Sequence, residues 1–383
     1  MSYLLLCTID TYTRNGFTKL ALMKSKVKIT IIRNPEEKEA LKYWKAVAAT
    51  FENFNPFFDC DFVETWLASI EHIPDLVIFT IEKTVLGAAF LGQKTERRRG
   101  VMINTLLLNQ SGNKNYDQYW VENNSIFCSP KYTRLFVTHL LEEIKRSADL
   151  LHISMATQHF QHALSKQSRQ FYSIETTVGY ATPLSSQSNS SFQTLLSKNT
   201  RYQINRSNRK LTEAFGDIHV VKGEPKNIPY FLERLSQFHI ERWGKSAEGS
   251  GFQNTYFKAH LNELLTNSRY NLAEIVMVKA GEQAIGFSIN FVLNGNVFFY
   301  CSGYDSHKAG KHIKLGYSFH YAVMRYYEQQ QYKTYDFLGG HYRYKKSLSS
   351  QKYNLYKVDI PLKSTKGNII KLVMKLRNLL SSA

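Results

Sequence analysis

One order of elements runs twice along this chain, and it limits the fold more than any single motif does. Apolar residues spaced by three and four predict helices, and short apolar or alternating runs predict strands. In both halves the predicted order is helix, helix, three strands, helix, strand and strand. The first-half segments are 36–49, 61–70, 76–82, 85–92, 101–109, 134–147, 150–155 and 171–184. The second-half segments are 229–243, 255–265, 272–280, 283–293, 296–304, 316–331, 334–338 and 353–362.

The connections in the second half indicate how its strands pair. Ala280-Gly281-Glu282 and Asn294-Gly295 are typical β-hairpin turns, so the three consecutive strands should be antiparallel. A helix must then cross to the following strand, which makes the sheet mixed. The sequence therefore predicts the α/β class, more narrowly a mixed α+β sheet that occurs in two similar units.

The length agrees with two domains, because 383 residues exceed the roughly 100–200 residues of one ordinary domain. We expect an N-terminal domain over 23–184 and a C-terminal domain over 196–383. The serine-rich stretch "PLSSQSNSSF" predicts a flexible linker over 185–195. Met23 is an alternative start, so residues 1–22 are expected to be an ill-ordered extension.

The formal net charge of +18 predicts a surface that attracts anions. Nucleic acid, anionic lipid and a phosphate-bearing cofactor all fit this charge, and so does a basic surface that only solvates the protein. No apolar run approaches the ~20 residues of a membrane helix. The four cysteines are scattered without a CxxC spacing, which predicts a reduced, cytoplasmic protein without disulfides or zinc. His159 and His162 have no acidic or cysteine neighbours to complete a metal site, so no metal is predicted.

A candidate cofactor loop follows the strand 296–304. The segment 300–318 brings Lys311, Lys314 and Gly316 to the start of a helix, where free N–H groups suit a pyrophosphate. The lysines add positive charge, and glycine allows close approach of the backbone. Loops with glycine and lysine are also common without any ligand, and that interpretation stays open.

Several stretches together resemble one known family. They are "LLSKNTRYQINRSNRKLTEAFG" (195–216), "QFHIERWG" (237–244), "GYD…KLGYSFH" (303–320), "YDFLGGHYRYKKSL" (335–348) and "LLLNQSGNKNYDQYWVENNSIF" (106–127). In this order and spacing they are similar to the BioF2-like branch of the GNAT acyltransferase superfamily, the cellulose-biosynthesis-type acetyltransferases. The resemblance implies tandem GNAT-like domains, as in the peptidoglycan bridge-forming aminoacyl-tRNA transferases. Family members usually carry Pro-Gly where this chain has Leu315-Gly316.

The resemblance implies a cleft between two strands of the C-terminal domain. Strands 334–338 and 296–304 would lie side by side and splay apart to admit an acyl thioester, with the cluster 335–348 at the mouth. Backbone N–H groups near Cys301 would polarise the thioester carbonyl, while the cysteine itself has no paired histidine and is interpreted as core. The implied cofactor-binding residues are Cys301, Ser302, Gly303, Lys311, Lys314, Gly316, Tyr317 and Ser318.

Five side chains are candidates for catalysis. Asp336 could hold a substrate amine or orient a neighbour, and Lys345 could pair with a phosphate or carboxylate. Tyr304 and Tyr344 could donate a proton to the departing thiolate. His239 is a candidate base, because a pKa near ~6.5 suits that task. The alternative is a solvated loop whose tyrosines pack, together with a partly buried, satisfied histidine.

The candidate substrate-binding residues are Glu122, Asn123, Arg201, Arg206, Trp243 and His341. Trp243 lies one helical turn from the candidate base, and the two arginines belong to a basic run, 197–210, without an acid. Glu122 and Asn123 of the first domain would line the opposite wall of the cleft. A solvated basic surface and a plain polar turn explain the same residues without function.

The implied reaction is direct transfer of an acyl group, acetyl by preference, from acyl-CoA to an amine or hydroxyl acceptor. The acceptor would be a small molecule or an envelope or polysaccharide precursor, and neither a metal nor a covalent intermediate is expected. One alternative donor is aminoacyl-tRNA, the only case in which a nucleic-acid partner is expected. Another alternative is a non-catalytic basic binding module on a decayed GNAT fold.

The C-terminal segment 368–380 is amphipathic, with lysines on one face and aliphatic residues on the other. Such a helix usually packs on its own domain. It could instead rest on an anionic membrane, which would place a cytoplasmic enzyme at the inner face of that membrane. Both interpretations stay open.

Overall fold

The computed structural model describes residues 27–98, 100–119, 121–167, 172–184, 191–246, 249–310 and 312–381. The predicted extension 1–22, most of the serine-rich linker and Lys311 lie outside the described residues.

The repeated order of elements is confirmed. The first repeat consists of β1 (Val27–Ile32), α2 (Glu37–Ala48), α3 (Cys60–Ser69), β2 (Asp75–Ile81), β3 (Thr84–Arg98), β4 (Val101–Leu108), β5 (Phe127–Cys128), α4 (Thr133–Glu143), β6 (Leu150–Thr157), α5 (Gln158–Gln167) and β7 (Tyr172–Pro183). The second consists of β8 (Ile218–Lys222), α7 (Ile228–Trp243), α8 (Thr255–Thr266), β9 (Ala273–Ala280), β10 (Gln283–Leu293), β11 (Asn296–Tyr304), α9 (Leu315–Gln329), β12 (Thr334–Gly339), α10 (Arg343–Leu348) and β13 (Gln351–Pro361). Helix α6 (Lys198–Phe215) joins the repeats, and α11 (Thr365–Ser381) follows the second.

Two kinds of element that the sequence patterns did not indicate correspond between the repeats, whereas β5 occurs in the first repeat only, among the described residues. Each repeat begins with a strand that was not predicted, β1 in the first and β8 in the second. Each also has an unpredicted helix before its last strand, α5 in the first and α10 in the second. The predicted hairpins are confirmed, with Asn294 and Gly295 both at positive φ, 50° and 76°, between β10 and β11. Positive φ at both positions matches the right-handed twist of the strands that the turn joins.

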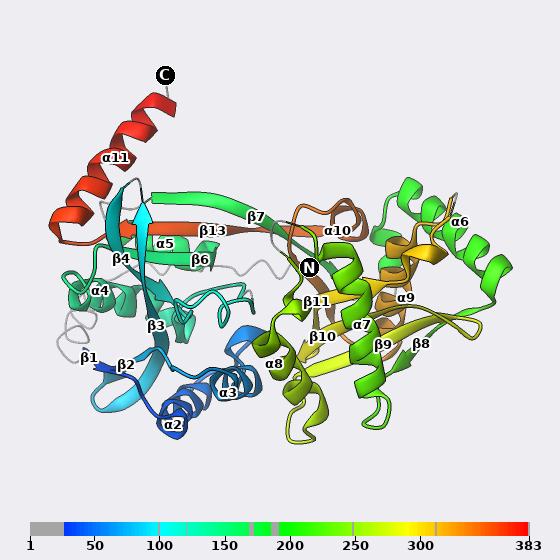
Figure 1. Ribbon diagram of the computed structural model, residues 1–383, viewed down its shortest axis with the longest axis horizontal. Helices are drawn as coiled ribbons and strands as arrows, with labels where there is room; N and C mark the ends of the chain where they lie inside the picture. The colour runs from blue at the N-terminus through cyan, green and yellow to red at the C-terminus, as the bar shows by residue number, and fades with distance from the viewer. Residues whose placement is uncertain are drawn as a thin grey trace, which may run out of the picture.

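The strands form one mixed sheet in the order β1-β2-β3-β4-β6-β13-β7-β12-β11-β10-β9-β8, with β5 paired beside β3. The last strands of the two repeats are exchanged: β13 lies next to β6, and β7 lies next to β12. β7 and β13 also pair with each other, and Figure 1 shows these long strands crossing between the repeats. The ranges 23–184 and 196–383 therefore meet in a single sheet, with β13 returning to the first.

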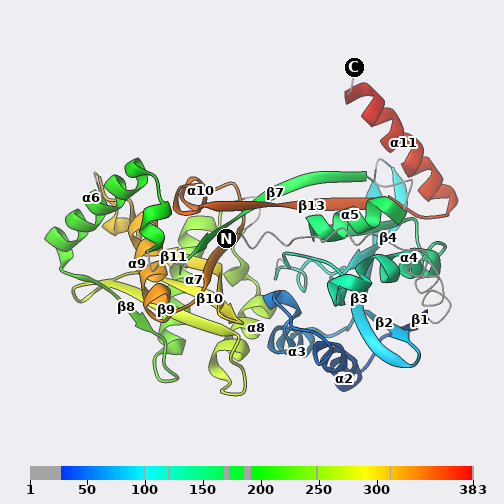
Figure 2. The ribbon, with the colours of Figure 1, turned by 180° about the vertical axis from the view of Figure 1, so that it is seen from behind.

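The helices cover the two faces of the sheet. Helices α4 and α5 pack on one face of the first half, and α6, α9 and α10 pack on one face of the second, as Figure 2 shows from behind. Helices α2, α3, α7 and α8 contribute to an apolar core shared by both repeats. Within it, Phe62 of α3 contacts the ring of His260 of α8, with ring centroids 4.8 Å apart. Burying each large apolar side chain contributes about 1.5–3 kcal/mol, so the shared core holds the repeats together.

Candidate active site

The parallel strands β11 and β12 pair over a short distance and then separate. Their registered pairs are Asn296–Thr334, Val297–Tyr335 and Phe298–Asp336. Both strands continue beyond the last pair, β11 as far as Tyr304. The pairing of these two strands therefore ends where the sequence resemblance implies that they separate.

Beyond its last pair with β11, β12 still lies beside β7, and charged side chains bind its backbone. Asp336 accepts a hydrogen bond from the Leu338 N–H at 2.7 Å, and Glu122 accepts one from the Gly339 N–H at 2.6 Å. Lys345 donates two hydrogen bonds from Nζ, one to the Gly339 carbonyl at 2.6 Å and one to the Phe337 carbonyl at 2.7 Å. Because these groups satisfy the backbone of β12, its end does not need β11 as a partner.

The backbone at this point has a demanding geometry. The register of β12 against β7 shifts between Asp336 and Gly339, and Leu338 has a φ of 58°. A non-glycine residue at positive φ is costly unless its surroundings fix it. A Cβ on Gly339 would lie 2.9 Å from Thr177 and 3.0 Å from the Glu122 carboxylate. Glycine is therefore required where the first repeat approaches β12.

The three charged groups titrate close to neutrality. Burial raises the pKa of Glu122 to about 7, against the attraction of Lys345. Burial lowers the pKa of Lys345 to about 8, against the attraction of Glu122 and Asp336. Burial also raises the pKa of Asp336 to about 6. Groups with such shifts, gathered where the pairing of two strands ends, indicate a functional site.

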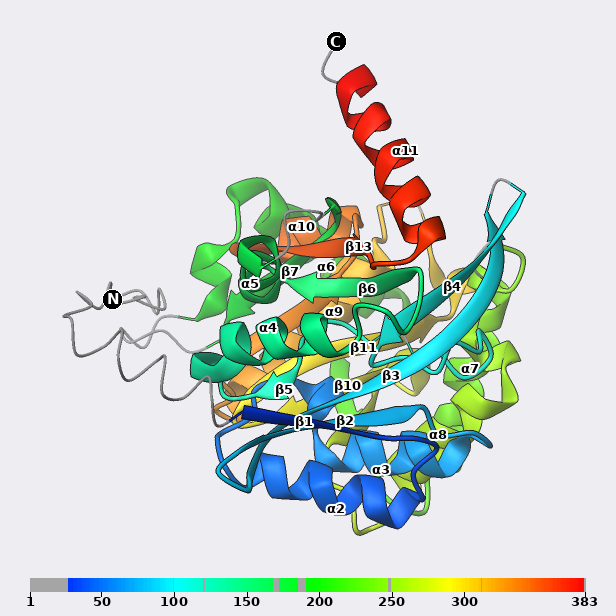
Figure 3. The ribbon, with the colours of Figure 1, turned by 90° about the vertical axis from the view of Figure 1, so that its left-hand side faces the viewer.

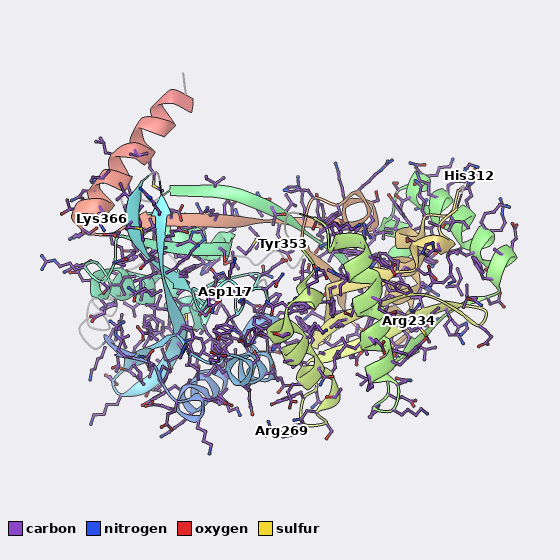
Figure 4. All side chains as sticks on the ribbon, viewed as in Figure 1. Asp117, Arg234, Arg269, His312, Tyr353 and Lys366 are labelled. Carbon is purple, nitrogen blue, oxygen red and sulfur yellow. The ribbon has the colours of Figure 1, made fainter. Side chains whose placement is uncertain are left out.

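Two further residues support Asp336 and Glu122. Tyr353 of β13 donates to both oxygens of Asp336, at 3.0 and 3.1 Å. The side chain of Asn123 interacts with Tyr353, and Asn123 adopts a positive φ of 54°. Figure 4 labels Tyr353 where the long strands pass from one repeat to the other. The sequence patterns did not single out Tyr353, because only the exchange of β13 brings it to β12.

A second polar group lies beside the gap, on the side of α9. The Tyr304 hydroxyl accepts a hydrogen bond from Ser302 at 2.8 Å and bonds to Nε2 of His320 at 2.8 Å. Burial raises the pKa of Tyr304 to about 12 and lowers the pKa of His320 well below its ordinary value. Tyr344 stacks on the His320 ring with centroids 4.7 Å apart. His320 is a new candidate, whose only signal in the sequence is a histidine on the apolar side of the helix after β11.

His239 and Trp243 lie on α7. Nδ1 of His239 is 2.8 Å from the Ser250 hydroxyl, and burial lowers the pKa of this histidine to about 4. Trp243 makes an edge contact with Tyr342, at 5.9 Å between ring centroids. Arg242, which the sequence interpretation missed, lies over the rings of Trp243 and Tyr304. His341 is exposed.

The residues of the predicted cofactor loop have different surroundings. Ser318 donates to the Ser207 hydroxyl of α6, and the Tyr317 hydroxyl donates to Ser347. These two side chains pack α9 against its neighbours. In contrast, a Cβ on Gly316 would meet no atom within 4 Å, so the first turn of α9 is open on that side. Lys314, just before this turn, reaches Gln203 of α6 with its amino group.

Cys301 and Gly303 face α7. Burial raises the pKa of the Cys301 thiol far above its ordinary value, which opposes a nucleophilic role. A Cβ on Gly303 would lie 2.6 Å from the Leu235 carbonyl, so this glycine allows α7 to approach β11 closely. Both residues therefore shape the wall of the gap, and their predicted contacts with a thioester stay predictions.

The basic run on α6 is not brought to Glu122. Arg201 donates to the Leu196 carbonyl at 2.5 Å, at the start of its own helix. Neither Arg201 nor Arg206 interacts with Glu122 among the interactions of the described residues. Figures 1 and 2 show α6 at the outer end of the second repeat. The predicted contacts of Arg201 and Arg206 with a substrate therefore stay predictions.

Across the described ranges, no three His, Cys, Asp or Glu side chains lie close enough to hold a metal ion. Within the same ranges, none of the helices is both apolar and long enough to cross a membrane.

The comparisons with known proteins agree with this geometry. Residues 198–346 match the family model described as an acetyltransferase (GNAT) domain. This range contains β11, β12 and Lys345, whereas Glu122 and Tyr353 come from outside it. No curated protein sequence matches the chain.

Three solved structures share the fold at low sequence identity. FemX is 11% identical with a TM-score of 0.55, over 89% of this chain and 100% of its own. L-PGS from Bacillus licheniformis is 12% identical with a TM-score of 0.51, over 89% and 96%. The C-terminal domain of a candidate lysylphosphatidylglycerol synthetase from Agrobacterium fabrum is 7% identical with a TM-score of 0.54, over 88% and 96%. The predicted mixed α/β fold with GNAT-like domains is confirmed, and residues 198–346 are similar to a GNAT-type acetyltransferase domain.

Proposed function

We propose that this protein is an acyltransferase that takes an acyl group from a CoA thioester and delivers it to an amine. The observation that carries the proposal is the gap beyond Phe298 and Asp336, together with the charged cluster at that point. An unpaired strand edge offers N–H and C=O groups to an extended ligand. The cluster supplies the acid–base groups that acyl transfer needs.

The donor would lie along the free part of β11. The open first turn of α9 at Gly316, with Lys314 beside it, suits the phosphate end of the donor. Backbone N–H groups near Ser302 would polarise the carbonyl. Acetyl is the acyl group that we propose, because residues 198–346 match an acetyltransferase family model.

Proton movements follow from the pKa shifts. Glu122, with its pKa near 7, accepts the proton that the attacking ammonium group must lose. A C–N bond then forms while the C–S bond breaks, and the positive charge of Lys345 stabilises the negative charge of the transition state. Tyr304, neutral below a pKa of about 12, gives its proton to the departing thiolate and takes up the second proton that the attacking nitrogen loses as it becomes an amide. Glu122 returns its proton to solvent after the product leaves. His239 is a weaker base than Glu122, because its pKa is about 4.

The acceptor is proposed at the level of chemical class: an amine, or a hydroxyl, on a small molecule or on an envelope or polysaccharide precursor. This choice, like placement in the BioF2-like branch, rests on the motifs that include 195–216 and 335–348. A cytoplasmic location follows from the donor, since CoA thioesters are intracellular metabolites.

Aminoacyl-tRNA is the alternative donor. The net charge of +18 and the acid-free basic run 197–210 favour it, because a polyanion gains from many such contacts. A non-catalytic anion-binding role is the second alternative. It gives no reason for placing Glu122 and a buried Lys345 together at the end of β12.

A binding experiment separates these functions. Thermal unfolding should be measured with acetyl-, succinyl- and long-chain acyl-CoA, and with aminoacyl-tRNA. We expect one thioester to raise the melting temperature in a saturable manner, the Lys314→Ala variant to lose this effect, and the exposed-lysine control Lys42→Ala to keep it. A response to aminoacyl-tRNA alone would replace the donor, and anion binding without turnover of any donor would reject the enzyme.

A further inference from the structure

The first repeat contains the counterpart of the open strand pair, but its gap is closed. β4 and β6 pair at Thr105–Leu150, Leu106–Leu151 and Leu107–His152. This is the same parallel, three-pair contact that β11 and β12 make. Beyond it, the segment 122–126 occupies the position that stays open in the second repeat, and Asn124 forms a bridge to Ala156 of β6.

Asn124 joins both strands of this pair. Its N–H donates to Met155 of β6 at 2.9 Å, and its carbonyl accepts from Thr157 at 3.2 Å. Its side-chain Nδ2 donates to the Leu108 carbonyl at the end of β4, at 3.0 Å. Asn124 has no exposed surface, so a single residue spans the gap and leaves no room for an extended ligand.

Asn109 completes the closure from the side of β3. Its amide oxygen accepts from the Phe90 N–H at 2.9 Å. Its Nδ2 donates to the Asn124 side chain at 2.8 Å and to the Ser125 carbonyl at 2.7 Å. Buried amides that satisfy each other fix one arrangement, because any other would leave a polar group unpaired.

The same segment delivers Glu122 to the second repeat. Glu122 precedes Asn124 by two residues and binds the Gly339 N–H of β12. We propose that Asn124 is a positioning residue that closes the first repeat to donors and fixes Glu122 at the open gap. The chain would then have one donor site, assembled from both repeats. The catalytic part of this inference rests on the proposed function.

Three variants test the role of Asn124. In Asn124→Ala and Asn109→Asp, we expect kcat/KM to fall at least tenfold, because Glu122 loses its fixed place. The rise of kcat/KM with pH, which the titration of Glu122 should produce near pH 7, should also move; this rise is the pH limb. Leu106→Ala, which makes a cavity in the same strand pair, should lower the melting temperature but leave the pH limb unchanged. Equal pH profiles for all three variants would reduce Asn124 to a structural role.

Two readouts do not depend on turnover. Calorimetric titration of the wild-type chain should give one thioester per chain, and two per chain would overturn the closed first repeat. A crystal structure of Asn124→Ala should show Glu122 displaced from Gly339, and an unmoved carboxylate would overturn the positioning role. If no thioester binds at all, the proposed function fails. The crystal structure of Asn124→Ala still tests whether Asn124 positions Glu122.

A separate observation concerns α11, which is attached to the body mainly at its start. Ser364 donates to Asp149 at 2.6 Å and accepts from the Gly367 N–H at 2.8 Å. A Cβ on Gly367 would lie 2.2 Å from the Leu362 carbonyl, so this turn is tightly seated. Figures 1 and 3 show the rest of α11 projecting away from both repeats.

The projecting helix carries apolar and basic residues. Ile369, Leu372 and Val373 are 51%, 59% and 39% exposed, and their spacing of three and four gives one stripe. The sequence continues this spacing with Leu376, Leu379 and Leu380, and the segment 365–381 contains four cations and no acid: Lys366, Lys371, Lys375 and Arg377. An apolar stripe with cations and no acids is complementary to an anionic lipid surface. We infer that α11 lies on such a membrane, with the net charge of +18 adding long-range attraction.

Vesicle sedimentation of the full chain tests this inference. We expect binding to vesicles of phosphatidylcholine with phosphatidylglycerol, weaker binding to phosphatidylcholine alone, and loss of the difference at 1 M salt, where the Debye length falls to about 3 Å. The double variant Leu372→Ser, Val373→Ser should lose binding. The control Val101→Ser, Met102→Ser, which removes residues 40% and 47% exposed elsewhere, should keep it. Unchanged binding of the α11 variant would overturn the inference, as would a concentration-dependent dimer that this variant abolishes.

Discussion

Glu122 and Lys345 bind opposite ends of one residue: the carboxylate accepts the N–H of Gly339, and the amino group donates to its carbonyl, both at 2.6 Å. The two side chains come from different repeats; Lys345 is buried, and Glu122 and Asp336 are half-buried beside it. Their charges therefore stabilise each other and hold the end of β12.

Removing one charge of this group should cost more stability than removing two. Lys345→Met leaves Glu122 and Asp336 without their cation, and breaking a buried pair costs about 3–5 kcal/mol. The double variant Glu122→Gln, Lys345→Met should recover part of this loss but not the activity. Urea unfolding and kcat/KM measure the two effects, with the exposed neighbour Lys346→Met as the control. An active Lys345→Met enzyme would contradict the proposed site.

The activity should depend on pH with two limbs. Glu122 must lose its proton to act as a base, so kcat/KM should rise through about pH 7. Lys345 must keep its charge, so kcat/KM should fall through about pH 8. The groups interact, and the observed values belong to the coupled cluster. In Glu122→Gln the acidic limb should disappear, and a limb that persists at the same pH would assign it to another residue.

His239→Gln distinguishes the two candidate bases. The histidine is neutral at pH 7, since its pKa is about 4, and it cannot produce a limb near 7. We expect this variant to keep the acidic limb, with at most a modest loss of kcat. A pH profile that loses this limb would transfer the role of base from Glu122 to His239.

Two glycines should respond oppositely to alanine. In Gly339→Ala the new Cβ meets Thr177 at 2.9 Å and Glu122 at 3.0 Å, and overpacking of this kind costs about 1–3 kcal/mol. Gly316→Ala meets no atom within 4 Å and replaces glycine in a helix, which can add up to about 1 kcal/mol. Melting temperatures should therefore move in opposite directions. Equal losses of stability would show that the open first turn of α9 is filled in solution.

The sequence predicted much of the local structure around the site. The spacing of apolar residues marked the helices and strands of each repeat, and the hairpin turns fixed the pairing of β9, β10 and β11. Asp336, Lys345 and Glu122 were also among its candidates, because the stretches 335–348 and 106–127 resemble motifs of the GNAT acyltransferases. The missed residues, His320 and Tyr353, look like core aromatics in the sequence, and only their neighbours reveal them.

By itself, the sequence determined the repeated order of elements, because helical and strand periodicities arise from residues a few positions apart. The tertiary structure alone decided that β7 and β13 are exchanged and that Asn124 joins β4 to β6. It also decided that Glu122 meets Gly339, 217 residues away in the chain. These contacts depend on which buried groups satisfy one another across the repeats, and no local pattern of residues encodes that choice.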